Sequence, residues 1–298
     1  MDGILPIWKP TGMTSHDCVF KVRKHLQMKK VGHTGTLDPE VEGVLPLCLG
    51  KGTKIVPFLT DTDKTYRAIL CLGQATDTED QTGEIIASKE VERPIDVETI
   101  KEVLTQFKGD IEQVVPLYSA VKVNGKKLYE YARQNIKVER PKRTIHIHTI
   151  NFLETEYDEA TQQQTISFEV HCSKGTYIRT LCKDIGEILG YPAHMKHLIR
   201  TKSGTFNQED TIHLDEILHM EKDSIEKQLF PLVSGVTHLD IFSVDEETKQ
   251  RVLNGQKLKL PDISLSTSPF RVEHQGELLA IYDYHENKEE IKPVRVFS

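Results

Sequence analysis

The residues best suited to chemistry near the N-terminus lie in the stretch KVGHTGTLDPEVEGVLPLCLGKGTK, residues 30–54. Asp38 stands between a glycine- and threonine-rich approach and the apolar run 44–49. A short acid of this kind is ionised at neutral pH. Asp followed by Pro39 predicts an ordinary turn. The residues alone do not decide whether Asp38 only forms this turn or takes part in chemistry.

Two other chemistries do not fit this stretch. A phosphate-binding Walker loop needs four residues between its glycines and then Lys and Ser/Thr, whereas six residues lie between Gly43 and Gly50 and Lys-Gly follows. His16, His25 and His33 lie near Asp38 in the sequence, but they show no HxxxH or paired-carboxylate spacing. We therefore expect neither a nucleotide-phosphate loop nor a metal centre here.

The bulk composition indicates a globular protein. The 298 residues are 38% hydrophobic and 28% charged, enough for one large domain with an appendage or for two domains. The sequence has neither the roughly 20-residue apolar run of a membrane span nor the basic and apolar regions of a signal peptide. The five cysteines are scattered, without zinc spacing. We expect a cytoplasmic protein with reduced thiols, no structural metal and no membrane association.

The charge is unevenly distributed. The net charge is −7, yet residues 120–150 carry eight Lys/Arg against two acids and residues 171–204 carry six against two. Residues 205–298 carry 10 Lys/Arg against 18 Asp/Glu. Basic segments on an acidic protein can follow a phosphate backbone, although a solvated basic loop is the alternative.

Hydrophobic periodicity predicts interspersed helices and strands. Helices are expected after Ser15 and after Asp96, near residues 128–134 and over 177–189, with one or two more in the acidic segment 210–226. Strands are expected over 65–73 and in the stretches RTIHIHTINF and QTISFEVHC, and short strands and turns after residue 239. Because the order shows no regular βαβ alternation, the predicted fold class is α+β.

Five motifs, in order along residues 3–200, resemble one family. They are ILPIWKPTGMTSHD, VGHTGTLDPEVEGVLPLCLGKGTK, DKTYRAILCLGQATDTEDQTGEI, VPLYSAVKVNGKKLYEYAR and CSKGTYIRTLCKDIGEILG. Together they look like the TruB type of bacterial tRNA pseudouridine-55 synthases, and the last 60 residues resemble that family's PUA-like domain more loosely. Glu42 and Gly52 are small departures, and neither touches the GHTGTLDP core.

The resemblance implies the isomerisation of one uridine in the T-loop of tRNA to pseudouridine. Nothing is added or lost, so no cofactor is expected. By family correspondence the nucleophile is Asp38. A single carboxylate suffices for this role, because the protein has only to hold the other reacting groups in place. Arg179 matches the family's arginine, and its guanidinium would counter the desolvation of the Asp38 carboxylate. The alternative for Arg179 is a surface phosphate contact.

The resemblance also implies how the target base is held. Everting the base costs a few kcal/mol, which stacking on an aromatic ring, worth about 1–3 kcal/mol, can offset. Tyr66 matches the stacking tyrosine, which also helps to remove the C5 proton; ordinary strand packing is its alternative. His33 matches the residue that fills the gap left in the T-loop. Tyr177 and Leu198 complete the pocket, with core packing as the alternative for Leu198. Lys9 and Pro10 lie in the first motif and are expected to shape a loop of the protein more than to take part in the chemistry.

The expected organisation is a catalytic domain over residues 1–238 and a β-rich PUA-like RNA-binding domain over 239–298. The core is expected to be a mixed, largely antiparallel sheet flanked by helices, with an RNA-clamping insertion at about 120–150. The partner is the T-arm and elbow of tRNA, bound by a monomer that needs no protein partner.

Two other functions remain open from the sequence. One is an RNA chaperone or scaffold that remodels tRNA without catalysis. The other is a related synthase that acts on another RNA or on an RNA selected by a guide.

Overall fold

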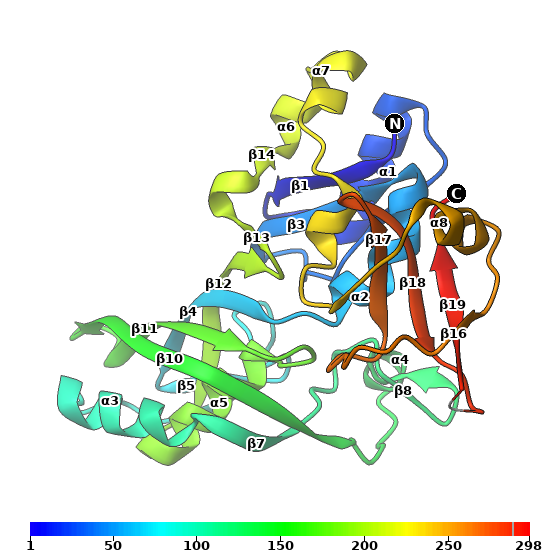
Figure 1. The fold of residues 1–298 in the computed structure, drawn as a ribbon. Helices are drawn as coiled ribbons and strands as arrows, with labels where there is room; N and C mark the ends of the chain where they lie inside the picture. The colour runs from blue at the N-terminus through cyan, green and yellow to red at the C-terminus, as the bar shows by residue number, and fades with distance from the viewer. Residues whose placement is uncertain (288) are drawn as a thin grey trace. The chain divides into compact units, whose positions relative to one another are not determined.

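The computed structural model describes residues 1–287 and 289–298, and the chain divides into two compact units (Figure 1). Unit 2 comprises Glu40–Gly43 and Asp63–Ser203. Unit 1 comprises Met1–Pro39, Val44–Thr62 and Gly204–Ser298. Each unit is described by itself.

Unit 2 is built on an antiparallel sheet whose strands follow the order β12-β4-β11-β10-β7. The strands are β4 (Lys64–Leu72), β7 (Gly109–Val114), β10 (Lys142–Asp158), β11 (Gln163–Cys172) and β12 (Ala193–Ser203). In β11 the alternate residues Ile166, Phe168, Val170 and Cys172 are buried, because successive side chains of a strand point to opposite faces. The alternation therefore assigns one face of β11 to the core.

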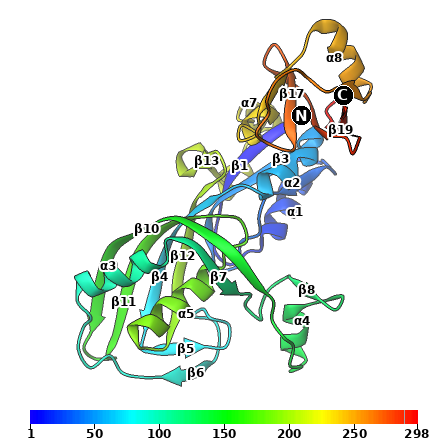
Figure 2. The ribbon, with the colours of Figure 1, turned by 60° about the horizontal axis from the view of Figure 1, so that its bottom comes forward.

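Two helices that contact each other pack against this sheet (Figure 2). They are α3 (Val97–Gln106) and α5 (Ile178–Leu189). Asp96 caps α3 by accepting a 2.9 Å hydrogen bond from the Thr99 backbone N–H. In α5, Ile178, Leu181, Cys182 and Ile185 recur at helical spacing and are buried, so they form the face that holds the helix on the sheet.

Shorter elements of unit 2 lie outside the main sheet. They are the hairpin β5 (Gln74–Thr76) and β6 (Ile85–Ser88), the hairpin β8 (Lys122–Val123) and β9 (Lys126–Lys127), and the helix α4 (Leu128–Arg133). The β8–β9 turn is Asn124-Gly125, with φ of +50° and +83°. Positive φ at both turn residues suits the right-handed twist of the strands, and Asn-Gly tolerates it best.

Strand β3 (Glu42–Leu49) is shared by the two units. Its first two residues belong to unit 2 and pair in parallel with Ile199 and Arg200 of β12, while the rest of β3 belongs to unit 1. Gly43 has a φ of +123°, and a Cβ there would lie 2.2 Å from the Arg200 carbonyl oxygen. Only glycine lets β3 approach β12 this closely.

The first part of unit 1 is a small sheet covered by α1. The strands follow the order β14-β1-β3, and β2 pairs with β3. These elements are β1 (Gly3–Lys9), β2 (Val31–His33), β14 (Ile212–His213) and α1 (Ser15–Leu26), with β13 (Phe206–Asn207), α2 (Val56–Thr60), α6 (Leu214–Ile217), α7 (Lys222–Lys227) and the 3-10 turns η1 (Gly50–Ile55), η2 (Gln208–Asp210) and η3 (Leu232–Gly235). One face of α1, with Cys18, Val19, Val22 and Leu26, packs into the core of this part.

The C-terminal part of unit 1 is a five-stranded sheet in the order β15-β17-β18-β19-β16. Its elements are β15 (Ile241–Ser243), α8 (Glu246–Leu253), β16 (Leu258–Lys259), β17 (Phe270–His274), β18 (Glu277–Tyr284) and β19 (Glu290–Val296). It has its own core, which includes Val252 of α8 and Phe270, Val272 and Tyr282 of the strands.

The predicted α+β class is confirmed, with a mixed, largely antiparallel sheet, flanking helices and a β-rich C-terminal part. Two local predictions were wrong. Thr14, not Ser15, caps α1, because Thr14 and Asp17 form a reciprocal capping box. Only short strands and turns were expected after residue 239, but Glu246–Leu253 form the helix α8, which Asp245 caps.

The described helices include none that is long and apolar enough to cross a membrane. All five cysteines are free and buried thiols. Burial raises the pKa of the Cys48 and Cys172 thiols to about 12, so these two sulfurs are unreactive at neutral pH.

Candidate active site

Asp38 lies exposed in the loop between β2 and β3 of unit 1, and backbone hydrogen bonds hold the residue on each side of it. The Leu37 backbone N–H donates to the buried Ser15 hydroxyl at 2.8 Å. The Pro39 carbonyl oxygen accepts from the Gly12 backbone N–H at 2.9 Å. Asp38 is thus an exposed residue on a loop whose two flanks are fixed.

Lys9 is the second anchor of the same loop. Its side chain is fully buried, and its ammonium donates to the carbonyl oxygens of Pro10 at 2.8 Å and Pro39 at 3.1 Å. A buried ammonium is stable only when hydrogen bonds replace its hydration, and here two of them go to this loop. The expectation that Lys9 and Pro10 build the loop agrees with these contacts.

His33 lies at the end of β2, half-buried and paired with Leu47 of β3. The next residue, Thr34, donates its backbone N–H to the Pro46 carbonyl oxygen at 3.2 Å. His33 and Asp38 therefore belong to one loop of unit 1, which the strand pair β2–β3 and the start of α1 position.

The remaining predicted site residues belong to unit 2, and two of them are on neighbouring strands. Tyr66 of β4 is paired with Arg200 of β12, and Ala68 with Leu198. Residues two apart on a strand, and the residues paired with them, point to the same face. Tyr66, Leu198 and Arg200 therefore share one face of the sheet, with Tyr66 half-buried and Leu198 buried.

Arg200 is a residue that the sequence reasoning missed. It is 1% exposed, and its guanidinium hydrogen-bonds the Tyr66 side chain. Burial lowers the pKa of Arg200, and the contact with Tyr66 acts in the opposite direction. The signal in the sequence was a cation at an inward position of the strand AHMKHLIRTKS, two residues after Leu198.

Arg179 lies in the first turn of α5 and is 6% exposed. Its guanidinium donates to the carbonyl oxygens of Thr78 at 3.1 Å and Tyr118 at 2.9 Å, and lies 3.9 Å from the Asp80 carboxylate. An arginine this buried does not fit the alternative of a surface phosphate contact. Its planar fork instead joins two loops of unit 2.

Tyr177 is the N-cap residue of α5, two residues before Arg179. The Gln113 side chain of β7 bonds both backbone groups of Tyr177, accepting at 2.8 Å and donating at 3.0 Å. The Arg143 guanidinium lies 5.4 Å from the centre of the Tyr177 ring. These contacts fix where α5 begins and hence where Arg179 lies.

The turn that receives Arg179 is held by Glu79, also missed from the sequence. Glu79 is buried with a φ of +64°, and its carboxylate accepts a 2.6 Å hydrogen bond from Thr180 and lies 3.6 Å from the Arg140 guanidinium. A positive φ in a glutamate is strained, so these contacts compensate for the cost. Desolvation raises the pKa of nearby Asp184, on α5, to about 6.

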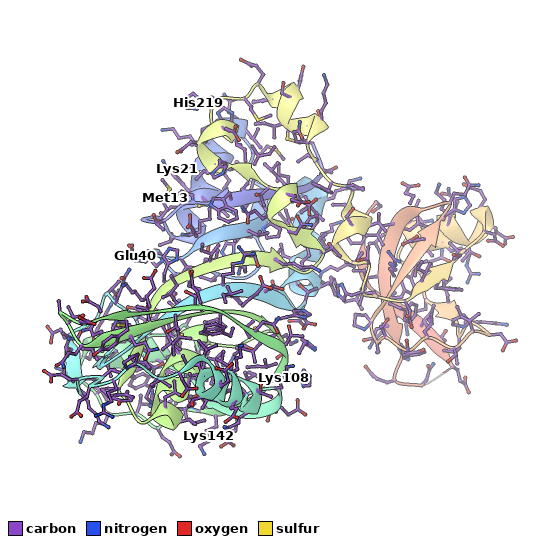
Figure 3. The ribbon with its side chains drawn as sticks, turned by 90° about the vertical axis from the view of Figure 1, so that its left-hand side faces the viewer. Met13, Lys21, Glu40, Lys108, Lys142 and His219 are labelled. Carbon is purple, nitrogen blue, oxygen red and sulfur yellow. The ribbon has the colours of Figure 1, made fainter. Side chains whose placement is uncertain are left out.

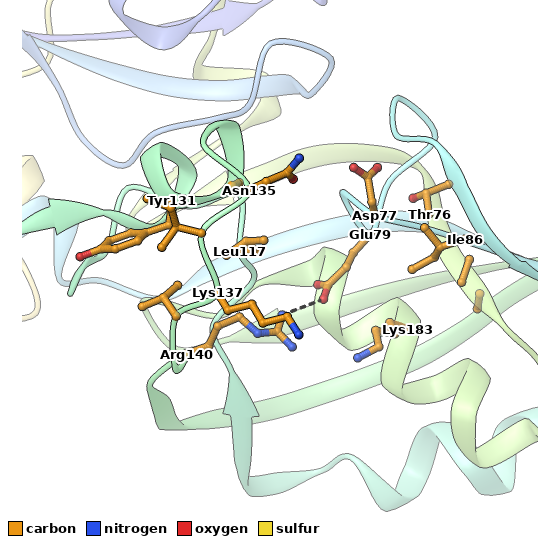
Figure 4. A pocket seen from close by; sticks show the side chains of 15 residues that line it. Thr76, Asp77, Glu79, Ile86, Leu117, Tyr131, Asn135, Lys137, Arg140 and Lys183 are labelled. Atoms are coloured by element: carbon orange, nitrogen blue, oxygen red, sulfur yellow. Dashed lines mark ion pairs between the residues drawn. The ribbon is translucent and has the colours of Figure 1, made fainter. Parts of the chain in front are cut away.

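Glu79 also lines a cavity of about 660 Å³ in unit 2, between the 75–79 turn and the segment that follows α4 (Figure 4). Figure 4 shows the ion pair of Glu79 with Arg140 among the lining residues. Lys137 and Lys183 also line it. Among the described residues of its lining, none is a predicted site residue.

The basic segment 120–150 is partly held by contacts of its own. Lys142 pairs with Glu112 at 2.7 Å, and the Arg133 guanidinium lies 5.2 Å from the centre of the Tyr129 ring. Lys142 and Lys108 are among the side chains that project from unit 2 (Figure 3). Other exposed cations of the segment could contact a phosphate backbone; they include Lys122, Lys126, Arg133 and Lys137.

Comparison with known proteins assigns this chain to one class, the enzymes that make pseudouridine. The profile of the TruB family pseudouridylate synthase N-terminal domain matches residues 23–178, and that of the tRNA pseudouridylate synthase B C-terminal domain matches residues 179–239. The chain belongs to the TruB family of pseudouridylate synthases.

Relatives match over nearly their whole length. The tRNA pseudouridine synthase B of Oceanobacillus iheyensis is 53% identical, over 100% of this chain and 98% of the relative. That of Bacillus subtilis is 49% identical, over 99% and 97%. Among solved structures, a Cbf5-Nop10-Gar1 complex contains a chain 28% identical with a TM-score of 0.78, covering 99% of this chain and 85% of the other.

Proposed function

We propose that this protein is a tRNA pseudouridine synthase that isomerises the T-loop uridine at position 55. Its family membership and its relatives, which are named tRNA pseudouridine synthase B, make it an isomerase that acts on tRNA. The observation that supports the site most directly is Asp38, an exposed carboxylate whose loop is anchored on both flanks within the GHTGTLDP motif.

In the proposed reaction Asp38 is the nucleophile. The bond between the ribose C1′ and N1 of the base breaks, and a bond between C1′ and C5 forms. C5 then loses its proton while N1 gains one, so atoms and electrons balance without a co-reactant. The attack of the carboxylate divides this rearrangement into easier steps, whether it begins at the ribose or at the base.

Tyr66 and Arg179 keep the roles that the family motifs imply. Tyr66 stacks on the everted base, and its place on a central strand, paired on both sides by β11 and β12, makes it a rigid platform. Arg179 steadies the reacting carboxylate, and its hydrogen bonds to Thr78 and Tyr118 restrict its rotamer. His33, Tyr177 and Leu198 complete the proposed uridine pocket.

The rest of the chain is proposed to bind the tRNA. The insertion at about 120–150 would contact the phosphates of the T-arm, and residues 239–298 would act as a PUA-like RNA-binding domain beside a catalytic domain of residues 1–238. We propose that a monomer acts on the tRNA elbow without a protein partner. Since tRNA is made and used in the cytoplasm, we expect the enzyme to act there.

The test replaces Asp38 by Asn in the full-length protein. Asn keeps the size of the side chain but cannot attack, so formation of pseudouridine should fall by about 10,000-fold or more while tRNA binding stays within about twofold. Release of tritium from [5-³H]uridine in a tRNA transcript measures the reaction, and filter binding measures affinity. Glu40→Gln, an exposed acid two residues away, is the matched control.

Two outcomes would decide against the proposal. Activity of the Asp38→Asn variant close to that of the parent would remove the nucleophile assignment. Parent protein that binds tRNA but forms no pseudouridine in a bare T-arm transcript would favour a chaperone, or a synthase that depends on a guide RNA.

A further inference from the structure

We propose that Asp63, His148 and His171 of unit 2 form a binding site for a divalent transition-metal ion, best matched to Zn²⁺. One ligand atom of each residue lies within 4.8 Å of those of the other two. The Nε2 atom of His148 is 3.0 Å and that of His171 is 3.9 Å from the same Asp63 oxygen, Oδ2. These separations are close to those between the ligand atoms of one ion, since zinc–nitrogen and zinc–oxygen bonds are about 2.0–2.2 Å.

Three adjacent strands bring the ligands together. Asp63 immediately precedes β4, His171 lies near the end of β11, and His148 lies in β10. His171 is paired with Thr65 on one side and with Thr149 on the other. The three residues therefore come from neighbouring positions across the sheet although they are far apart in the sequence.

A β-bulge presents His148 to the other two ligands. In the pairing of β10 with β11, Ile147 faces Cys172 and Thr149 faces His171, so His148 is the extra residue between them. A bulge redirects a side chain and is common next to functional sites. The bulge is thus a local irregularity that serves to place an imidazole beside a second imidazole, with ring centres 4.6 Å apart.

A third histidine, His146 of β10, lies close to His148 but does not belong to the proposed ligand set. The His146 ring centre is 4.7 Å from that of His148, but its Nδ1 atom is 2.7 Å from Asp110 on β7. That contact occupies His146 with a carboxylate of its own. The proposed ligand set therefore stays at two imidazoles and one carboxylate.

The ligand types select the ion. Mg²⁺ and Ca²⁺ prefer ligand sets made of oxygen atoms, whereas imidazole suits Zn²⁺, Co²⁺, Ni²⁺ and Cu²⁺. The three side chains are 36–46% exposed, so water can fill the fourth position of a tetrahedral Zn²⁺. Lys202 lies close enough to His171 for its positive charge to act there, and this charge would repel a bound cation. We therefore expect moderate rather than very tight binding of the metal ion.

A bound ion would join the start of β4 to β10 and β11. Tyr66 is only three residues after Asp63, so the strand that carries the proposed stacking tyrosine is the one the ion would fasten. The site is an accessory of the sheet, and the proposed isomerisation does not use it.

Titration of zinc chloride into the full-length, chelator-stripped protein tests the site by calorimetry. We expect one equivalent to bind and saturating zinc to raise the Tm by a few degrees, because the ion binds only the folded chain. His148→Ala and His171→Ala should each weaken binding at least tenfold. His197→Ala is the matched control, because His197 has Glu42 at 3.9 Å but belongs to none of the metal-ligand clusters found among the described residues.

Asp63→Asn supplies a second test that keeps the shape of the side chain, and circular dichroism without metal shows whether each variant is folded. Cobalt(II) bound to the parent should give the visible absorption of a low-coordinate ion, and Asp63→Asn should lose it. Parent protein that takes up no zinc would overturn the proposal. So would folded His148→Ala and His171→Ala variants that bind zinc as the parent does.

Discussion

The proposed catalytic residues are held in two different ways. Asp38 is an exposed side chain on a loop, and what holds it is a set of hydrogen bonds to the backbone of its neighbours. Arg179 is a buried side chain, as is Arg200, the buried partner of the proposed catalytic Tyr66, and both are held by their own polar contacts inside unit 2. In one region the hydrogen bonds fix the backbone beside an exposed side chain; in the other they fix the buried side chains themselves.

This difference has a physical reason. A nucleophile must meet a substrate that arrives from solvent, so its residue is best placed on an exposed loop. A group that stacks on the base or steadies a charge acts by being in place beforehand, which burial and hydrogen bonds ensure. The two regions should therefore respond differently to substitution, the loop mainly in activity and the buried groups in activity and stability together.

After Asp38→Asn, the largest effect is expected from Arg179→Lys. Lysine keeps the positive charge but lacks the fork that reaches both Thr78 and Tyr118, so one buried carbonyl oxygen loses its donor. We expect kcat to fall by about 100-fold or more and the free energy of unfolding to fall by about 1–3 kcal/mol. Tritium release and urea unfolding measure the two quantities. Lys183→Arg, at a half-buried position of the same helix, is the control, and a loss of activity without any loss of stability would contradict the comparison.

Tyr66→Phe should have the next largest effect. The ring that we propose to stack on the base remains, but the hydroxyl that we expect to help remove the C5 proton is lost, together with one hydrogen-bond partner of the buried Arg200. We expect kcat to fall by roughly 100-fold, with KM nearly unchanged, and the free energy of unfolding to fall by about 1–3 kcal/mol. Steady-state kinetics on a tRNA transcript separates kcat from KM. A large rise in KM alone would show that the hydroxyl binds the substrate and takes no part in the chemistry.

Lys9→Met tests the anchors of the Asp38 loop. The methionine fills the buried space but leaves the carbonyl oxygens of Pro10 and Pro39 without this donor. We expect kcat to fall about tenfold while tRNA affinity is kept, because the carboxylate remains but its loop is less well positioned. Lys21→Met, at a half-buried position of the neighbouring helix, is the control. Full activity in a folded Lys9→Met protein would show that the loop does not need this anchor.

Asp184→Asn should have the smallest effect, and on stability alone. Since the pKa of Asp184 is raised to about 6 in the folded protein, its ionised form is destabilised there, and the cost is present above pH 6 and absent below about pH 4. Removing the charge should therefore raise the free energy of unfolding by about 1–2 kcal/mol at pH 8, allowing for partial screening by solvent, and leave it unchanged at pH 4. Urea unfolding at the two pH values measures this, and an equal gain at both would rule out ionisation as the cause.

Much of the fold could be predicted because local patterns agree with it. The helices α3, α4 and α5 and the strands β4, β10 and β11 lie where periodicity put them, and Asp96 caps α3 as expected. The helix α8 was missed because its apolar positions are few and its sequence runs directly into Asn254-Gly255, which suggested a turn between strands. Short elements with one buried side leave little periodicity to detect.

The candidate site was predictable only where a motif marks it. Asp38, Tyr66 and Arg179 lie in family motifs, and no pattern of spacing would have selected them. Arg200 and Glu79 were missed because their importance comes from burial and from partners far away in the sequence, such as Tyr66 and Arg140. The grouping of Asp63 with His148 and His171 depends on strand register and on a bulge, and neither can be read from one sequence.

The hairpin turn Asn124-Gly125 has a consequence for the ageing of the protein. Both residues are exposed, and glycine has no side chain to hinder attack by its backbone nitrogen on the preceding side-chain amide. Deamidation through the resulting ring places a carboxylate, and in part an isoaspartyl backbone, between the lysines of β8 and β9. Stored preparations should thus acquire an acidic subpopulation whose altered turn lies in the segment that we propose to contact tRNA phosphates.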